Sequence, residues 1–260
     1  MSLEGFNFSG KRVLVTGASR GIGLGVARGF ANARARLSII GTNEKVHETA
    51  DQLRAETGAD VDGIICDIAD RNAVRKAFED LEPLDALVNN AGYERLTPIL
   101  DPDDNVETTF KRIVDINILG TYYVTREAVK KMKSGSSIVI TASVWGKTGM
   151  GGFSAYCATK HANIGFMRSL ADELGPHGIN VNAVCPGWVK TDAAMRSLSI
   201  MADNEGKSEE ACLEEILATQ AISGLMIPDD VASTYLFLAS DYAKNITGQT
   251  LNVDRGELIA

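Results

Sequence analysis

Two residues with the right spacing for proton transfer, Tyr156 and Lys160, lie in the run Tyr-Cys-Ala-Thr-Lys. Residues four apart on a helix project from the same face, so the lysine ammonium would lie beside the tyrosine phenol. A free tyrosine has a pKa near ~10, and a neighbouring cation favours its phenolate form. The pair could therefore act as a general base at neutral pH. An ordinary solvated helix face would have the same spacing, so the rest of the chain must decide between these interpretations.

Length, charge and cysteine content restrict the class of protein. The 260 residues, 45% of them hydrophobic, are enough for a single domain over residues 1–260 with a substantial core. The net charge of -8 argues against nucleic acid or an anionic membrane as a partner and favours a small molecule. The four cysteines form no C-x-x-C pair, so we expect neither a disulfide framework nor a metal site. No apolar run reaches the ~18 residues of a membrane span, and we expect a soluble, cytoplasmic protein.

A glycine-rich turn separates a predicted strand at 11–16 from a predicted helix. Strand, glycine turn and helix in this order form a dinucleotide-binding unit, because glycines allow close backbone approach and the helix N-terminus binds pyrophosphate. The spacing is G-x-x-x-G-x-G, which is more particular than the common G-x-G-x-x-G. The residues expected to contact the cofactor here are Gly17, Ser19, Arg20, Gly21, Ile22 and Gly23.

The residues after the second predicted strand, 36–40, bear on the choice of cofactor. An NAD-binding protein would carry an acid there for the ribose 2'-hydroxyl. This chain has Gly41 and Thr42 instead, and Arg20 could reach a 2'-phosphate, so the sequence favours NADP(H) over NAD(H). Two alternatives stay open: Arg20 as a solvated loop charge, and Glu44 in the role of the acid.

Short apolar segments alternate with longer helical patterns along the whole chain. Further strands are predicted at 62–66, 84–88, 136–141, 179–184 and 250–253, and helices at 45–57, 71–81, 106–132, from 153, and at 208–218 and 228–239. This alternation predicts a doubly wound α/β fold, with helices on both faces of a parallel sheet. Ligands of such sheets bind at the carboxyl ends of the strands, where Gly17, Asp67 and 89–92 would lie. Asp67 could equally cap the helix that follows it.

Two polar residues and one insertion would also lie near this edge. Asn117 falls among apolar positions of the predicted helix, with Phe110 in the same stripe, so it either satisfies the backbone at a kink or takes part in the site. Ser143 follows the strand 136–141 and could be a turn former or a site residue. Residues 190–224 could form a substrate lid or a surface helical hairpin, and we expect the lid.

Taken together, the motifs resemble the short-chain dehydrogenase/reductase family over nearly the whole chain. They are Thr16-Gly17-Ala18-Ser19-Arg20-Gly21-Ile22-Gly23, Asn89-Asn90-Ala91-Gly92, Asn117, Ser143, Tyr156-x-x-x-Lys160 and Pro186-Gly187. The resemblance implies a Rossmann-like sheet of seven parallel strands and NAD(P)-dependent redox chemistry on alcohols or carbonyls. It also implies a homo-oligomer, frequently a homotetramer.

The resemblance further implies roles for single residues. Tyr156 would be the general acid/base and Ser143 would bond the substrate oxygen. Lys160 would hold the nicotinamide ribose and lower the tyrosine pKa, and Asn117 would support a water-linked proton relay. Other cofactor contacts implied by position are Thr42, Asp67 at the adenine, Asn89, Ala91, Gly92, Pro186, Gly187, Val189, and Thr191 at the carboxamide. Independently of the resemblance, the loops at the ligand edge offer Trp145 and Trp188 as substrate contacts, with Tyr93, Glu94, Lys147 and Phe153 as further candidates. Each of these could equally be a surface-loop residue or pack at the rim of the pocket.

Two arginines depart from the family pattern. Arg34 stands where a glycine usually follows the first helix, so a left-handed residue there would be strained unless the helix ends differently. Arg255 stands where a glycine pair usually follows the last strand, which puts the C-terminal subunit contact in doubt.

The expected function is hydride transfer between NAD(P)(H) and a secondary alcohol or carbonyl substrate. One alternative within the family is a 3-oxoacyl-[acyl-carrier-protein] reductase. Another, from a different class, is a regulatory protein that senses NAD(P) without catalysis. The run Asn-Asn-Ala-Gly-Tyr-Glu resembles some sugar dehydrogenases.

Overall fold

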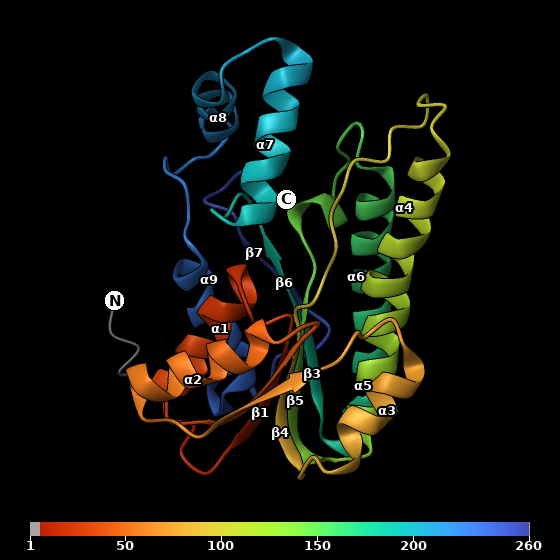
Figure 1. Ribbon diagram of the computed structural model, residues 1–260. Coiled ribbons are helices and arrows are strands. Elements are labelled where there is room, and N and C mark those ends of the chain that lie inside the picture. The colour runs from red at the N-terminus through yellow and green to blue at the C-terminus, as the bar shows by residue number, and fades with distance from the viewer. Residues whose placement is uncertain (1–5, 260) are drawn as a thin grey trace.

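A parallel sheet of seven strands forms the central layer of the computed structural model, which describes residues 6–259 (Figure 1). The strands are β1 (Arg12–Thr16), β2 (Arg36–Gly41), β3 (Val61–Ile65), β4 (Leu84–Asn89), β5 (Met132–Thr141), β6 (Asn180–Pro186) and β7 (Thr250–Val253). Their order is β3-β2-β1-β4-β5-β6-β7, so the winding reverses between β1 and β4. All seven predicted strands are confirmed, and the reversal marks the crevice where such sheets bind ligands.

Helices cover both faces of the sheet (Figure 1). On one face lie α1 (Gly21–Asn32), α2 (Lys45–Thr57) and α9 (Pro228–Ala239). On the other lie α3 (Arg71–Glu79), α4 (Asp104–Val114), α5 (Thr121–Val129) and α6 (Ser154–Leu174). Two more helices, α7 (Asp192–Glu205) and α8 (Glu209–Ala218), stand beyond the strand ends, at the top of Figure 1. No helix among residues 6–259 is both long and apolar enough to cross a membrane.

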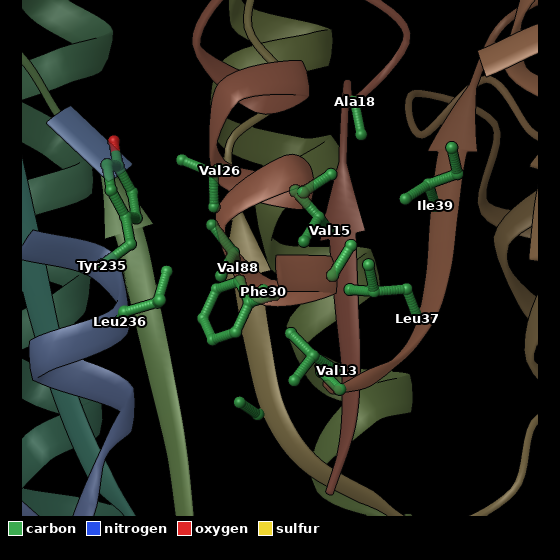
Figure 2. Close-up of a cluster of buried hydrophobic side chains, with 14 of the residues drawn as sticks. Val13, Val15, Ala18, Val26, Phe30, Leu37, Ile39, Val88, Tyr235 and Leu236 are labelled. Atoms are coloured by element: carbon green, nitrogen blue, oxygen red, sulfur yellow. The ribbon is translucent and has the colours of Figure 1, made fainter. Parts of the chain in front are cut away.

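The alternation of side chains along the strands explains why both faces need helices. Val13 and Val15 of β1 point to the side of α1 and pack in one buried cluster with Phe30 (Figure 2). Leu14, between them, packs in a second cluster on the opposite face. Because successive strand side chains point to opposite faces, an apolar run such as this is stable only when it is covered twice.

The prediction of one continuous helix over 106–132 is wrong, because the helix is interrupted and ends before Met132. The structure divides it into α4, a π-helical turn at Asp115–Gly120, and α5. A π turn takes in an additional residue, so it rotates the faces of the two flanking helices relative to each other. One apolar stripe therefore cannot run through both, and Phe110 of α4 is exposed at 39% rather than buried. Met132 continues the apolar pattern but pairs with Leu84 as the first residue of β5.

The insertion at 190–224 holds one helix more than predicted. The expected helix at 208–218 is α8, but α7 was not expected. Its signals are a side-chain cap and a left-handed glycine, since Thr191 Oγ1 accepts a bond from Ala194 N at 3.1 Å and Gly206 has φ 64°. The two helices pack on each other as a hairpin above the sheet.

Arg34 and Arg255 are the non-glycine residues with positive φ among those that the structure describes, at 67° and 56°. The left-handed conformation expected at Arg34 is therefore present, just after α1 ends. Arg255 follows β7 and donates from Nη1 to Ser223 O at 3.2 Å, so the last residues bond to the end of the insertion.

Replacing Arg34 with glycine should stabilise the protein. A left-handed non-glycine residue costs about 1–2 kcal/mol, and the greater freedom of glycine in the unfolded chain offsets part of this gain. We expect Arg34→Gly to raise the free energy of unfolding by about 1 kcal/mol, or the Tm by about 2–4 °C, in denaturant and thermal unfolding. Arg34→Ala removes the same exposed charge but keeps Cβ, so it should bring no gain. Equal stabilisation by both variants would assign the effect to the charge instead.

Candidate active site

Lys160 is a buried cation fixed at the carboxyl end of β5. Its side chain is 3% exposed, and its Nζ donates to the carbonyl oxygen of Thr141, the last residue of β5, at 2.7 Å. Burial lowers the pKa of Lys160 to about 8. The same Nζ lies 5.4 Å from the ring centre of Tyr156, one turn earlier on α6. The helical spacing predicted from sequence therefore does place the ammonium beside the phenol, at the ligand edge of the sheet.

The pKa of Tyr156 shifts in the direction opposite to the one expected. Burial raises it above the ordinary value, the carboxyl of Glu94 raises it further, and the nearby hydroxyl of Ser143 lowers it in part. Because removal from water disfavours the charged form of any group, the phenol and the lysine both shift toward neutrality. The lysine next to Tyr156 therefore does not by itself bring the pKa of the phenol below its ordinary value, because burial acts against it. The expectation that Lys160 and an oxidised nicotinamide together make the phenol acidic stays a prediction.

Ser143 serves as a cap and lines the same pocket as Tyr156. It follows β5 in an extended conformation, and its Oγ accepts a bond from Trp145 N at 3.1 Å, at the start of the 3-10 turn Val144–Gly146. Accepting that bond leaves the hydroxyl proton available for another acceptor. Both interpretations of Ser143 from the sequence are therefore compatible with its position.

Asn117 lies in the π-helical turn and joins three segments. Its Oδ1 accepts from Tyr93 N at 2.7 Å, and its Nδ2 donates to Tyr93 O and to Thr159 Oγ1, each at 3.0 Å. The side chain is 1% exposed. Its amide thus satisfies the backbone of the loop after β4 and holds that loop against α6, which was the structural alternative for this residue.

The glycine turn packs directly against the loop after β4. A Cβ on Gly17 would lie 2.7 Å from Ala91 Cα, and a Cβ on Gly23 would lie 2.3 Å from Gly17 O, so no larger residue fits either position. Gly92, in the same loop, lies near Lys160, because a Cβ there would be 3.5 Å from its Nζ. The predicted cofactor residues on the two loops are therefore neighbours.

The N-terminus of α1 is built to receive an anion. The residue before it, Arg20, makes no side-chain cap, and the first turn carries no acid. The first amide groups of a helix have no intrahelical acceptor, and the helix dipole favours negative charge there. Uncapped amides beside closely packed glycines fit the pyrophosphate of a dinucleotide.

The side chains of Asn89 and Asn90 donate hydrogen bonds to different parts of the structure. Asn89, a predicted cofactor contact, is buried and donates from Nδ2 to Thr125 Oγ1 at 2.8 Å, so its side chain turns toward α5. Asn90 was not among the predicted contacts, yet its Nδ2 donates to Thr16 O at 3.0 Å and to Gly17 O at 3.3 Å. Adjacent residues at the end of a strand face opposite sides, which was the available signal that only one of the pair could reach the turn.

The last residue of β2, Gly41, leaves no room for an acid at its own position. A Cβ on Gly41 would lie 2.9 Å from Val46 Cβ and 3.3 Å from Ser19 Oγ. Thr42, the next residue, and Arg20 of the glycine turn are both exposed. Glu44 is the N-cap residue of α2, and its Oε2 lies 4.0 Å from His47 Nε2.

Asp67, after β3, does not cap a helix. Its Oδ1 accepts from Ala69 N at 3.0 Å and its Oδ2 pairs with Arg112 Nη2 at 2.5 Å, whereas Asp70 caps α3 through the amides of Asn72 and Ala73. The capping alternative for Asp67 is therefore wrong, and its contact with the adenine stays a prediction.

A pocket opens where these loops meet below α7. It is lined by Ile22, Glu94, Ser143, Val144, Trp145, Tyr156, Gly187, Trp188, Val189, Thr191, Ala193, Ala194 and Ser197. Pro186, also predicted, is the buried last residue of β6. Thr191 lies against the glycine turn, since a Cβ on Gly21 would be 3.3 Å from its Cγ2. The pocket residues that come from α7, such as Ser197, were not predicted, because the sequence patterns did not predict that helix.

Three candidate substrate contacts do not line the pocket. Lys147 turns away, because its Nζ donates to Asn252 Oδ1 at 2.6 Å beside β7. Phe153 is buried behind Trp145, with ring centres 4.9 Å apart. Tyr93 lies under the guanidinium of Arg95, at 4.6 Å. The candidates that do line the pocket are Glu94, Trp145 and Trp188. Residues 6–259 contain no cluster of three or more His, Cys, Asp or Glu that could hold a metal ion.

Comparison with known proteins agrees with this arrangement. Residues 17–257 match the sequence model of a family described as enoyl-(acyl carrier protein) reductase. A 3-oxoacyl-[acyl-carrier-protein] reductase of Rickettsia typhi is 37% identical over 257 residues, covering 97% of this chain and 99% of that protein. A short-chain dehydrogenase of Burkholderia cenocepacia, solved with NADP, has a TM-score of 0.84 at 30% identity, covering 96% of this chain and 99% of that one.

The L-sorbose reductase of Gluconobacter frateurii, solved with NADPH and L-sorbose, has a TM-score of 0.88 at 26% identity, and each chain is covered to 100%. The extent of these matches, together with the pocket beside the glycine turn, shows the family. The chain belongs to the short-chain dehydrogenases/reductases and is an NAD(P)-dependent oxidoreductase that acts on alcohol or carbonyl groups.

Proposed function

We propose that this enzyme uses NADP(H), with Tyr156 as the general acid/base and Ser143 as the second hydrogen-bond donor to the substrate oxygen. The observation that carries the proposal is that Tyr156 and Ser143 line one pocket, next to the uncapped start of α1 and with Lys160 directly behind the phenol. General acid/base catalysis requires such groups within hydrogen-bond reach of one oxygen.

The raised pKa of Tyr156 suits the reduction of a carbonyl. A neutral phenol can give its proton to the carbonyl oxygen as that oxygen gains negative charge, while the Ser143 hydroxyl donates to the same atom. When bound, the nicotinamide supplies the hydride in reduction and accepts it in oxidation. The phenolate left on Tyr156 is stabilised by the Lys160 ammonium, 5.4 Å from the ring centre. In oxidation, the same phenol must first lose its proton.

The proposed contacts to the dinucleotide follow the carboxyl edge. The amides of Gly21, Ile22 and Gly23, with Ser19, would hold the pyrophosphate. Arg20 and Thr42 would surround a 2'-phosphate, and the crowding at Gly41 supports this, because an acid at that position would collide with Val46. A guanidinium is well suited to a phosphate, which makes NADP(H) the preferred cofactor. Ala91 and Gly92 would lie at the ribose beside Lys160.

A second candidate function is reduction of a 3-oxoacyl thioester on an acyl carrier protein. The 37% identity with the Rickettsia typhi reductase, over nearly the full length of both chains, favours it. The non-catalytic sensor gains no such support, since Ser143, Tyr156 and Lys160 are present together at one pocket. Assembly as a homotetramer in the cytoplasm stays a prediction.

Tyr156→Phe should remove the proton donor and little else. Because general acid/base catalysis contributes roughly 10²–10⁴-fold, we expect kcat to fall at least about 100-fold, measured by nicotinamide absorbance with a ketone substrate. Binding of NADPH, followed by its fluorescence, should stay within about twofold of wild type. Tyr123→Phe, which deletes the hydroxyl of a half-buried tyrosine outside the pocket, is the matched control and should keep normal turnover. A Tyr156→Phe enzyme with a substantial fraction of wild-type kcat would exclude the role.

The cofactor preference should depend on Arg20 and on the absence of an acid at 42. Arg20→Ala should raise KM for NADPH about tenfold and leave KM for NADH nearly unchanged, because only the former has a 2'-phosphate. Thr42→Asp should lower kcat/KM for NADPH further and favour NADH through the ribose hydroxyls. Arg36→Ala, an exposed arginine at the opposite end of β2, is the control. Wild-type preference for NADH would refute the assignment.

Lys160→Met should separate function from stability. Activity should be lost, because the phenolate loses its cation, yet the protein should be at least as stable at pH 7. The lowered pKa of Lys160 corresponds to a burial cost of roughly 3 kcal/mol, and the unpaired Thr141 carbonyl takes back about 1–3 kcal/mol.

The difference in the free energy of unfolding between wild type and Lys160→Met should depend on pH. Between pH 8 and 10.5 the unfolded lysine holds its proton while the folded one releases it, so the unfolded state binds more protons. The free energy of unfolding of wild type, relative to Lys160→Met, should therefore rise over this interval in denaturant titrations. A constant difference would show that Lys160 has an ordinary pKa.

A further inference from the structure

Glu94 is an acid in the pocket that the proposed proton transfer does not use. It lines the same pocket as Tyr156 and Ser143, and its charge contributes to the raised pKa of Tyr156. Burial raises the pKa of Glu94 itself. Burial disfavours the charged form of Glu94, and its charge in turn disfavours ionisation of the Tyr156 phenol. Because an acid at this position is unfavourable in both respects, we expect it to bind a ligand there.

A residue of the insertion at 190–224 holds the carboxyl of Glu94 in place. Its Oε1 accepts a bond from Ser197 Oγ of α7 at 2.7 Å, and Ser197 is 4% exposed. Among residues 6–259, Oε2 receives no hydrogen bond, and it is not one of the fully buried oxygens. One oxygen is thus fixed by the helix above the pocket, and the other is an accessible acceptor.

The rest of the pocket lining combines three aromatic rings with small and aliphatic side chains and carries no positive charge. The rings of Trp145 and Trp188 lie 6.2 Å apart at 82°, and Trp145 also meets the Tyr156 ring edge-on at 6.0 Å. None of the side chains that line the pocket is cationic, since Lys147 bonds to Asn252 outside it. Arg95 and Arg196 are close enough for their charges to act on Glu94, but neither lines the pocket. A substrate carboxylate inside the pocket would therefore face Glu94 with no cationic side chain in the lining, which costs free energy.

These features favour one class of substrate. Aromatic faces pack against the C–H groups of a ligand, and a free carboxylate oxygen accepts from a hydroxyl. We propose that Glu94 is the specificity-determining residue, and that it accepts a hydrogen bond from a hydroxyl of an uncharged polyhydroxylated ketone, or of the corresponding polyol in the reverse direction. Keto acids and hydroxy acids are disfavoured by the same group. This inference rests on the proposed function of Tyr156 and Ser143.

The test compares three ketones that differ in what they offer Glu94. A ketohexose carries hydroxyls, 2-hexanone carries none, and 5-oxohexanoate carries a carboxylate. With NADPH and the full-length enzyme, wild type should show kcat/KM for the ketohexose at least about tenfold above that for 2-hexanone, and the lowest value for 5-oxohexanoate.

Variants at Glu94 should change this order. Glu94→Ala should lower kcat/KM for the ketohexose about 10–100-fold, the loss of one hydrogen bond to a charged group, and should change that for 2-hexanone by a clearly smaller factor. Glu94→Gln keeps an acceptor and removes the charge, so it should lose less with the ketohexose and gain with 5-oxohexanoate. Glu79→Ala, an exposed acid at the opposite end of the sheet, is the control.

The outcomes separate the role of Glu94 from the proposed proton transfer. Equal losses on all three ketones in Glu94→Ala, or a wild-type preference for 5-oxohexanoate, would overturn the role of Glu94 and leave the proposed proton transfer intact. No turnover of any ketone by wild type, alongside tight NADPH binding, would overturn the proposed function and this inference with it.

Discussion

The bond from Lys160 Nζ to the Thr141 carbonyl oxygen is the contact on which the rest of the site depends. It joins the second turn of α6 to the last residue of β5 at 2.7 Å and places a buried ammonium there. Since Tyr156 is one turn earlier on the same helix, this bond also fixes where the phenol points. The buried charge is unfavourable for stability, and in the proposed mechanism it stabilises the negative charge that the phenol acquires after it has given up its proton.

The parallel sheet explains why the remaining groups gather around this contact. Because all strands are parallel, the loops that follow them lie at the same edge of the sheet. The glycine turn, the loop after β4 and Ser143 therefore meet there although they are far apart in the sequence. The tight packing of Gly17 on Ala91 sets the distance between two of these loops. The insertion places α7 above the pocket, and Ser197 of this helix donates a hydrogen bond to Glu94. The proposed proton transfer and the proposed substrate contact thus involve different residues of one pocket.

Much of this could be predicted from the sequence because it depends on periodicity and order. Short apolar runs and glycine turns recur regularly enough that all seven strands fall where expected. Tyr156 and Lys160 share a helix, so their spacing alone placed them together. The π turn at Asp115–Gly120 was not predictable in the same way, because an additional residue in one turn leaves no mark in composition.

Other features depend on contacts between distant segments. The direction of Lys147 is set by Asn252, more than a hundred residues later, and the bond between Glu94 and Ser197 required a helix that sequence patterns did not reveal. The sign of the Tyr156 pKa shift was missed for a related reason. Spacing shows that a cation is near, but the opposing effect of burial depends on the whole fold.

The central claim is that Tyr156 is a neutral acid in the protein alone and that Lys160 stabilises its phenolate only after proton transfer. The most direct measurement is an ultraviolet titration of tyrosinate absorbance in the cofactor-free enzyme, with the Tyr156→Phe curve subtracted. The account predicts no Tyr156 ionisation below a pH of about 10, the ordinary pKa of the side chain. A tyrosinate that forms between about pH 6 and 8 in wild type and is absent from the variant would contradict it.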